Sequence, residues 1–578
     1  MTQEQAAAPA EEIAVGRGDP VYMAHAYLTK VPVPAILPFV ETYCPPGGIV
    51  ADPFAGSGMT GVAAAMLGRG ARLSDISVLG RHIGSNYVNL VQPTSFEKYG
   101  VEVLAASRVR VGSLYDVECR LCGNVGRLAK SVWSYLVECR GCRRGINYYE
   151  ALEAADWSKA DMRCPHCATW VSSRNPRVGE DPVLDYVVCS CSKQQVEQSP
   201  SVRPEVDFTD LRVPDVQITP ERQMYRASAL GKSGLVTVAS YYSDRNLAVL
   251  ASIHEEILRV PDEAVRNKLL FAFTACLTRA SKRYQWSRQR PLNAANANYY
   301  IAPVFYEWSV YELFERKLAA VKRSDDWIRD SRRNRVPAEE VDRPDVTYRS
   351  ASADALPLDA ASVDYVFTDP PFGSNLFYAD MALFQEGWLD GFTDVQREAV
   401  IDRSSNGRRS AEWYEKLLTA ALRECRRVLK PGGQVSMVFG NSSGKVWALV
   451  QRSIATAGLR VVPEALVVLN KGQRSVKGLA SGFEHVATLD LIITMEPDRS
   501  EQGQVLTDPA VTDVSDLVRE LAERETSKTP SHLYLELLRA ALRRHWNMSE
   551  LDLKLVTSTL LADGWTVDAK RGTLTRSV

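Results

Sequence analysis

The sequence predicts an α/β protein in which a long insertion interrupts a parallel sheet. Patterns of amphipathic helices and buried strands alternate between about residue 33 and residue 77. The next strand pattern of similar character, SVDYVFT, begins only at residue 362. Between them lie eight of the 11 cysteines, in close pairs from Cys119 to Cys191. A gap of this length needs folded content of its own.

The elements follow one another in a regular order outside the insertion. We expect a helix at residues 33–44, a turn and strand at 45–54, a helix at 58–70 and a strand at 71–77. Helical patterns occupy residues 246–260 and 264–284 of the insertion, and a helix, a Pro-Gly-Gly turn and a strand follow at 412–439. Residues 497–528 are polar and predict a linker, and residues 565–578 predict a hairpin.

Composition sets broad limits on the protein. Its 578 residues, 45% of them hydrophobic, suffice for two to four domains. The 69 basic and 70 acidic residues nearly cancel, so any nucleic-acid surface must be local. We find no signal-peptide pattern and no long apolar stretch, and therefore expect a cytoplasmic protein with no membrane partner.

A glycine-rich turn lies between the first predicted strand and its helix. We call residues 52–61, DPFAGSGMTG, the glycine loop. Glycines at Gly56 and Gly58 allow a tight turn and let a ligand approach the backbone closely. Asp75 ends the next strand, where a carboxylate can accept hydrogen bonds from ribose hydroxyls. This arrangement predicts a site for a nucleoside-containing cofactor.

A second loop follows the strand that resumes the sheet. We call residues 369–372, Asp369-Pro370-Pro371-Phe372, the Asp-Pro-Pro loop. An exocyclic amine of a base is a poor nucleophile, and hydrogen-bond acceptors such as the Asp369 carboxylate and the Pro370 carbonyl favour its attack. The prolines stiffen the loop, and Phe372 can stack on a base rotated out of a duplex.

Together the two loops resemble the DPFxGSGT and DPPY/F motifs of DNA amino-methyltransferases, and the resemblance covers residues 20–90 and 345–495. It implies a Rossmann-like, S-adenosylmethionine-dependent methyltransferase sheet, with catalysis by the Asp-Pro-Pro loop. The cofactor contacts that it implies come from both halves of the sheet: Thr29 in HAYLTKVP, Asp52, Phe54, Gly56, Gly58, Asp75 and Asp354. Asn375 and Tyr378, in SNLFYADM, are the implied pocket-shaping residues.

The cysteine pairs have the spacing of zinc ribbons. In chain order, Cys119-x2-Cys122 with Cys139-x2-Cys142 makes one set, and Cys164-x2-Cys167 with Cys189-x-Cys191 makes a second. Four thiolates fill a tetrahedral Zn²⁺ site completely, so we expect two structural zinc ions rather than a catalytic one. Redox pairs are the alternative interpretation.

The helical part of the insertion carries a basic segment with aromatic neighbours. Arg283, Trp286 and Arg288 lie in SKRYQWSRQR, a composition that suits phosphate neutralisation and base stacking. A solvated helix end is the alternative. Because target-recognition regions of the resembled family lie outside the sheet, we predict that these residues contact double-stranded DNA.

These observations divide the chain into seven segments. They are a flexible arm (1–20), the first part of the methyltransferase domain (21–112), a zinc-binding insertion (113–198), a helical target-recognition insertion (199–345), the second part of the methyltransferase domain (346–496), a linker (497–528) and a small C-terminal helical domain (529–578).

The resemblance favours methylation of adenine N6 in DNA, in restriction-modification or phage defence with restriction or defence subunits as partners. Three alternatives stay open. They are a DNA cytosine-N4 methyltransferase, an RNA guanine-N2 methyltransferase and a non-catalytic zinc-ribbon DNA-binding subunit.

Overall fold

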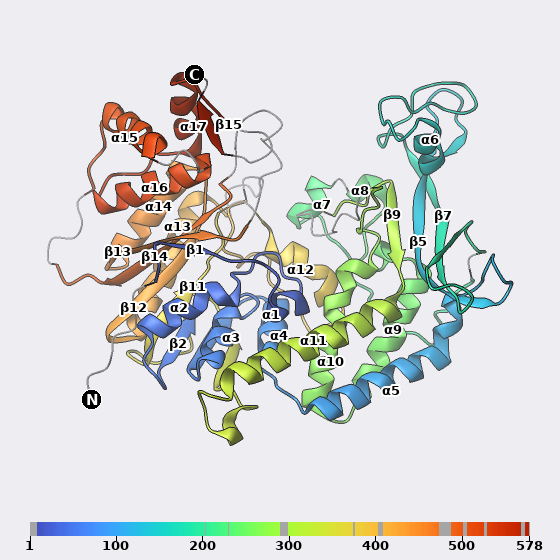
Figure 1. The fold of residues 1–578 in the computed structure, drawn as a ribbon, viewed down its shortest axis with the longest axis horizontal. Helices are drawn as coiled ribbons and strands as arrows, with labels where there is room; N and C mark the ends of the chain where they lie inside the picture. Colours follow the sequence, from blue (N-terminus) through green and yellow to red (C-terminus); the bar gives the residue numbers. More distant parts are fainter. Residues whose placement is uncertain are drawn as a thin grey trace.

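The computed structural model of the chain describes residues 9–202, 204–228, 230–288, 299–373, 376–402, 409–472, 487–500, 506–524, 529–567 and 573–576. Within these residues, eight strands form one mixed sheet at the centre of the α/β fold (Figure 1). In spatial order the strands are β1 (Glu12–Ala14), β13 (Leu459–Asn470), β14 (Asp490–Pro497), β12 (Leu429–Phe439), β11 (Val363–Thr368), β2 (Ile49–Asp52), β3 (Gly70–Asp75) and β10 (Val346–Ser350).

The expected parallel sheet is confirmed for the five strands from β12 to β10, whereas β14 runs antiparallel to both of its neighbours. The chain order reverses between β2 and β11, which are adjacent although the whole insertion separates them. In open sheets with helices on both faces, the carboxyl ends of strands at such a point form a crevice. Asp52 and Thr368 occupy these two ends.

Both faces of the sheet are buried because successive strand residues point to opposite sides. Tyr365 and Phe367 of β11 belong to one apolar core, and Val366, which lies between them, belongs to the other. The helices next to the first core are α1 (Pro20–Ala24), α2 (Val33–Tyr43), α3 (Met59–Met66), α4 (Val78–Tyr87) and α12 (Tyr378–Glu386). The second core is covered by α13 (Ala411–Val428) and α14 (Gly444–Thr456).

A helical bundle combines helices of the helical insertion with the helix at residues 93–111, which precedes both insertions. Its helices are α5 (Pro93–Val111), α7 (Gln223–Ala227), α8 (Leu230–Ser233), α9 (Asp244–Leu258), α10 (Glu263–Ala280) and α11 (Val310–Arg332). The two helices expected from periodicity are confirmed as α9 and α10. Helix α11 packs against both α10 and α1, which joins the bundle to the sheet domain.

A second, antiparallel sheet carries the cysteines. Its strands are β4 (Asp116–Glu118), β5 (Val125–Glu138), β6 (Gly145–Asn147), β7 (Arg177–Val188), β8 (Val196–Gln198) and β9 (Val304–Trp308), with helix α6 (Tyr148–Ala154) beside β6. The long strands β5 and β7 form a ribbon that rises from the bundle, with α6 towards its far end (Figure 1). Strand β9, from the helical insertion, pairs with β5, so both insertion segments share this sheet.

The C-terminal part packs on the central sheet. It comprises α15 (Val511–Arg524), α16 (Pro530–Arg543), α17 (Leu553–Ala562) and the antiparallel pair β15 (Trp565–Val567) and β16 (Leu574–Arg576), where a hairpin was expected. Helix α15 lies in the segment expected to be a linker. Val514, Leu517, Val518 and Ala522 recur at helical spacing and are buried, which explains why this polar segment folds.

Strands β1 and β10 are among those that lie where the sequence predicts none. Strand β1 falls in the segment expected to be a flexible arm and pairs with β13. Strand β10 is an edge strand with mostly exposed or half-buried residues, so it lacks the apolar run that marks a buried strand. No helix in the described part of the chain is both long and apolar enough to cross a membrane.

Candidate active site and metal centres

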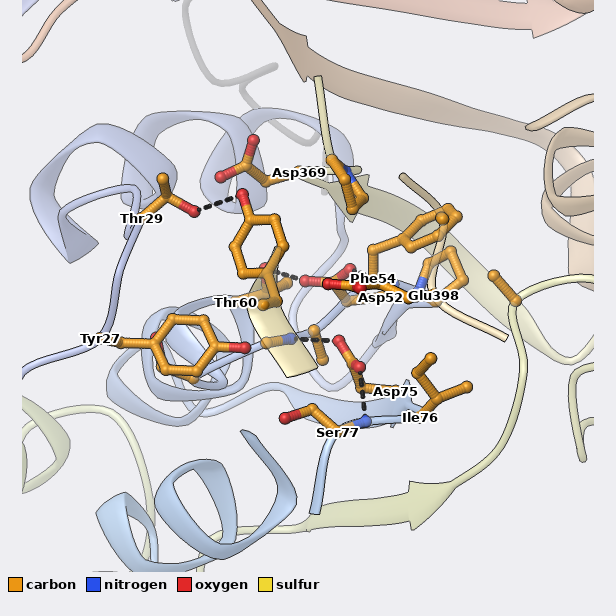
Figure 2. A pocket seen from close by; sticks show the side chains of 18 of the residues that line it. Tyr27, Thr29, Asp52, Phe54, Thr60, Asp75, Ile76, Ser77, Asp369 and Glu398 are labelled. Carbon is orange, nitrogen blue, oxygen red and sulfur yellow. Dashed lines mark hydrogen bonds between the residues drawn. The ribbon is translucent and has the colours of Figure 1, made fainter. Parts of the chain in front are cut away.

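One cavity lies at the carboxyl ends of β2, β3, β10 and β11 (Figure 2). It encloses about 940 Å³ of empty space, its open mouth included. Asp52 and Asp75 line it from the first part of the sheet, and Asp369 and Pro371 line it from the second. The glycine loop and the Asp-Pro-Pro loop therefore open into a shared cavity, as the sequence predicts.

The two glycines of the glycine loop have different surroundings. Both have positive φ, 46° at Gly56 and 78° at Gly58. A Cβ on Gly56, which lines the cavity, would lie 3.2 Å from the Tyr27 ring. A Cβ on Gly58 would lie only 2.6 Å from the Cα of Gly84 in α4. Gly58 is not among the described lining residues, and its close approach to α4 explains why glycine is needed there.

Asp52 connects the two loops by hydrogen bonds. Its carboxylate accepts from the hydroxyls of Thr60, at 2.7 Å, and Thr368, at 2.8 Å, and from the Phe54 backbone N–H at 3.1 Å. Burial raises the pKa of Asp52 to about 7, while these donors act in the opposite direction. Asp52 is thus a positioning residue for both loops as well as part of the cavity wall.

Asp75 is held by two backbone groups. Its carboxylate accepts from the N–H groups of Gly56 and Ser77, each at 2.8 Å (Figure 2). Burial raises the pKa of Asp75, and the two N–H groups counteract this rise. A carboxylate oxygen has more than one lone pair, so Asp75 can also accept from hydroxyls in the cavity. Phe54 adds a half-buried ring to the same wall.

The residues of the Asp-Pro-Pro loop face different directions. Asp369 and Pro371 line the cavity, whereas Pro370 is buried. The Phe372 ring packs on the Phe439 ring, with centroids 5.1 Å apart. The backbone carbonyl of Phe372 accepts a hydrogen bond from the Asn441 side chain at 2.8 Å. Phe372 is not among the described lining residues, so its stacking on a base stays a prediction. Asn375 lies outside the described residues.

Asp369 has the electrostatics of a proton acceptor near neutral pH. Burial raises the pKa of its carboxyl to about 7, and Asp490 and Asp52 add to this rise. Lys471, which pairs with Asp490, counteracts it. A base with a pKa close to the working pH is well suited to proton transfer.

A pair of hydroxyls faces these carboxylates. The Thr29 hydroxyl and the Tyr378 hydroxyl lie 3.0 Å apart within hydrogen-bonding distance, and both residues line the cavity (Figure 2). Burial raises the pKa of the Tyr378 hydroxyl, so it stays protonated. The Tyr27 ring lies beside the Tyr378 ring, with centroids 6.5 Å apart and planes inclined by 29°. The structure thus brings Thr29 and Tyr378, predicted separately, into contact.

Asp354 is placed differently from its expected position. It is exposed and is not among the described lining residues, whereas Ala351, Ser352 and Ala353 do line the cavity. Strand β10 ends at Ser350, and the following turn directs Ala353 inwards and Asp354 towards solvent. The acid that the resemblance assigns to the cofactor at this position does not face the cavity.

The ionisable residues of the cavity wall that the sequence does not predict include Glu398 and Lys30. Glu398 accepts from the Ala379 N–H and from Arg409, both at 3.1 Å, and burial raises its pKa to about 7. It lies in an irregular polar stretch with no recognisable pattern. Lys30 is buried and donates to the carbonyls of Tyr22 and His25 at 2.8 and 2.7 Å. Lys30 directly follows Thr29, a predicted cofactor-binding residue, and this neighbourhood could have marked it as a residue of the site.

The cysteines form two groups of four, but their pairing differs from chain order. The groups are Cys119, Cys122, Cys189 and Cys191, and Cys139, Cys142, Cys164 and Cys167. The expected pairing of consecutive sets is therefore wrong. The ribbon explains why, because antiparallel pairing of β5 with β7 returns the chain from its far end to its base. The last cysteine pair meets the first, and the two middle pairs meet at the far end.

Both groups fit a tetrahedral zinc ion. The four sulfur atoms of each group lie within 4.8 Å of one another, and neighbouring pairs lie 3.5 to 3.7 Å apart. Zinc–sulfur bonds of about 2.3 Å in tetrahedral geometry place sulfur atoms about 3.8 Å apart. Each group can therefore hold one Zn²⁺ with all four positions filled.

The three residues of the basic segment lie in two places. Trp286 packs beside Tyr149 and Trp157, with centroids 5.4 and 5.3 Å away, and the exposed Arg288 lies 4.9 Å above the Trp157 ring. These residues form a cationic and aromatic surface near α6. Arg283 is instead buried, with its guanidinium 4.6 Å above the Phe384 ring.

No curated protein matches the chain. Residues 8–93, which include the glycine loop, Thr29 and Asp75, match the family model N6_N4_Mtase, described as DNA methylase. This match supports a DNA methyltransferase that acts on amino groups.

Proposed function

We propose that the protein is an S-adenosylmethionine-dependent methyltransferase that methylates adenine N6 in double-stranded DNA. The observation that carries this proposal is the shared cavity of the glycine loop and the Asp-Pro-Pro loop. The central sheet has five parallel strands, and their chain order reverses between β2 and β11. This order supports a Rossmann-like sheet that binds its ligand at the point of reversal.

Residues of the glycine loop and its neighbours suit the cofactor. The Asp75 carboxylate would accept hydrogen bonds from the ribose hydroxyls of the cofactor, and Phe54 would pack on an apolar face of the cofactor. Gly56, which has no side chain, leaves room for the cofactor beside Tyr27. The Thr29–Tyr378 hydroxyl pair faces the same space. S-adenosylmethionine supplies an electrophilic methyl group on a sulfonium. Transfer of this methyl group requires no metal ion. We therefore assign the two cysteine groups a structural role.

Residues of the Asp-Pro-Pro loop suit the target amine. Asp369 would accept a hydrogen bond from the amino group and take up the proton that the amine loses on methylation. A base inside a duplex cannot reach a carboxylate at the bottom of a cavity, so the target nucleotide must rotate out of the helix. The motif Asp-Pro-Pro-Phe favours methylation of adenine N6 over cytosine N4, and this preference rests only on the resemblance to the family.

Residues outside the sheet suit the DNA backbone. The cationic and aromatic surface formed by Tyr149, Trp157, Trp286 and Arg288 lies near α6, towards the far end of the ribbon, and would contact phosphates and bases away from the target nucleotide. We assign the zinc-binding and helical insertions to target recognition, between the two parts of the methyltransferase domain. A role in restriction-modification or phage defence stays a prediction of the resemblance.

One experiment tests the reaction, its substrate and its product. The protein is incubated with methyl-labelled S-adenosylmethionine and with DNA or RNA in separate reactions, and the nucleic acid is digested to nucleosides. We expect label in N6-methyl-2′-deoxyadenosine from DNA, and about 100-fold less or lower still with Asp369→Ala. Label in N4-methyl-2′-deoxycytidine from DNA, or in N2-methylguanosine from RNA, would replace this proposal by one of its alternatives. No label in any product would favour a non-catalytic DNA-binding protein.

A further inference from the structure

A second cavity lies next to the active-site cavity, and the two share a wall. Tyr27 and Tyr378 line both of them. The second cavity encloses about 1100 Å³ of empty space, its open mouth included, between α1, α10, α11 and α12. Neither the resemblance, which covers residues 20–90 and 345–495, nor the matched family segment, residues 8–93, includes the residues of α10 and α11 in its wall.

The charged side chains that line this cavity are all basic, although Arg316 also pairs with Glu312 on α11 at 2.6 Å. Arg279, Arg283, Arg316 and Lys317 line it, and none of the described lining residues is acidic. Arg279 and Arg316 are exposed at the solvent side, where both guanidinium groups lie near the Trp308 ring, at 6.0 and 5.6 Å. Four cations around one cavity, in a protein whose charges nearly cancel overall, favour an anionic ligand.

The remaining wall suits a planar base. Its apolar part includes Leu28, Leu79 and Met381, next to the two tyrosine rings. Gln385 is 92% buried and donates from its Nε2 to the Thr278 hydroxyl at 3.2 Å, whereas its Oε1 has no hydrogen-bond partner among the described residues. A buried acceptor without a partner is costly, and a ligand amino group would satisfy it.

We propose that this second cavity binds a nucleotide, with its base against the apolar wall and its phosphate against Arg279 and Arg316. The amino group of adenine, cytosine or guanine would donate to Gln385 Oε1. Two sources share this chemistry, a free mononucleotide and a nucleotide of the DNA strand next to the target. The second source rests on the proposed function, because the wall shared with the active site would hold two nucleotides of one strand side by side.

The test measures binding of two probes, deoxyadenosine monophosphate by calorimetry and a labelled dA10 strand by fluorescence anisotropy. Ala382→Phe fills the cavity from α12 without changing charge, and Arg279→Gln/Arg316→Gln removes two charges. We expect each variant to weaken at least one probe tenfold or more. Arg323→Gln, an exposed change on α11 outside the cavity, should leave both affinities within twofold of the wild type.

Gln385→Leu provides a third variant, since it removes the acceptor with little change in volume or charge. Gln385→Leu should weaken the binding of at least one adenine-containing probe severalfold. This result can be measured even if Ala382→Phe proves unstable in a melting experiment. Weakening of both probes would assign a free nucleotide, and weakening of dA10 alone would assign a DNA strand. Unchanged binding in folded Ala382→Phe and in Gln385→Leu would overturn the proposal, even if the arginine variant bound less tightly, because surface charge alone would then explain that loss.

These binding measurements require no methyl transfer. A protein that binds either probe in this cavity but methylates no nucleic acid would contradict the proposed function and leave the nucleotide site standing. If all three variants methylate DNA normally and bind both probes as the wild type does, the nucleotide site is contradicted and the proposed function stands.

Discussion

The hydroxyl of Thr368 donates a 2.8 Å hydrogen bond to the carboxylate of Asp52, 316 positions earlier in the chain. Thr368 directly precedes Asp369, and Asp52 begins the glycine loop. Both groups are buried, so the bond is sheltered from water. It fixes the two loops of the active-site cavity relative to each other, and the same carboxylate holds Thr60 at the start of α3.

Thr368→Val tests this connection. The change keeps the shape of the side chain but removes the donor, which should cost about 1–3 kcal/mol of stability. We expect methyl transfer to fall about 10- to 100-fold, because small displacements of reacting groups are costly. Thr494→Val is the matched control, since it removes a 2.8 Å bond to Ser436 within the sheet, away from the cavity. Equal effects of both changes on the rate per folded molecule would contradict the connection.

Asp369→Ala should separate catalysis from cofactor binding. Loss of the acceptor should lower transfer by about 100-fold or more, because proton acceptors contribute on that scale. The affinity for S-adenosylmethionine, measured by calorimetry, should stay within about twofold, since Asp75 and Gly56 lie on the other side of the cavity. If cofactor binding is lost as well, the division of roles between the two loops is incorrect.

Methyl transfer should rise with pH through about 7. Burial raises the pKa of Asp369 to about 7, so its carboxyl keeps a proton at pH values where an exposed aspartate is ionised. The accepting form is the carboxylate, which predominates above this pKa and is lost below it. A pH profile of kcat/KM checks this, and Glu398→Gln should leave the rise in place. A rise that vanishes in Glu398→Gln would identify Glu398 as the titrating group.

Gly56→Val should abolish cofactor binding while the protein remains folded. A Cβ at this position meets the Tyr27 ring at 3.2 Å, and the branched side chain would extend into the cavity. Gly47→Val is the control for backbone strain. Gly47 also has positive φ, 72°, but no atom lies within 4 Å of its Cβ position. Similar loss of binding in both variants would show that strain, and not cavity filling, is responsible.

Zinc content can distinguish the nested cysteine groups from consecutive ones. Cys122 and Cys191 belong to one group and Cys142 to the other. After dialysis, Cys122→Ser/Cys191→Ser should keep about one zinc per chain, and Cys122→Ser/Cys142→Ser should keep none. The consecutive pairing predicts the opposite result. Chelation of the wild type should lower its melting temperature, and unchanged stability after measured zinc removal would contradict a structural metal.

Local signals in the sequence were sufficient for the loops. A strand, glycines and a helix in succession predict the glycine loop, and an apolar strand before Asp369 predicts the Asp-Pro-Pro loop, because each depends on neighbouring residues. Edge elements were harder to predict. Strand β10 buries little apolar surface, so it lacks the pattern that a deeply buried strand shows. Helix α15 does carry apolar residues at helical spacing, from Val514 to Ala522, but they lie in a segment whose polar composition predicts a linker.

The sequence by itself determined the chemistry available to this protein: the carboxylates at Asp52, Asp75 and Asp369, and eight thiolates with metal-binding spacing. The tertiary structure alone decided which of these groups meet. It turned Asp354 outwards, brought Glu398 into the cavity, and paired the first cysteines with the last. The reason is physical, since backbone conformation follows from adjacent residues, whereas a cavity wall or a metal site depends on packing between segments far apart in the chain.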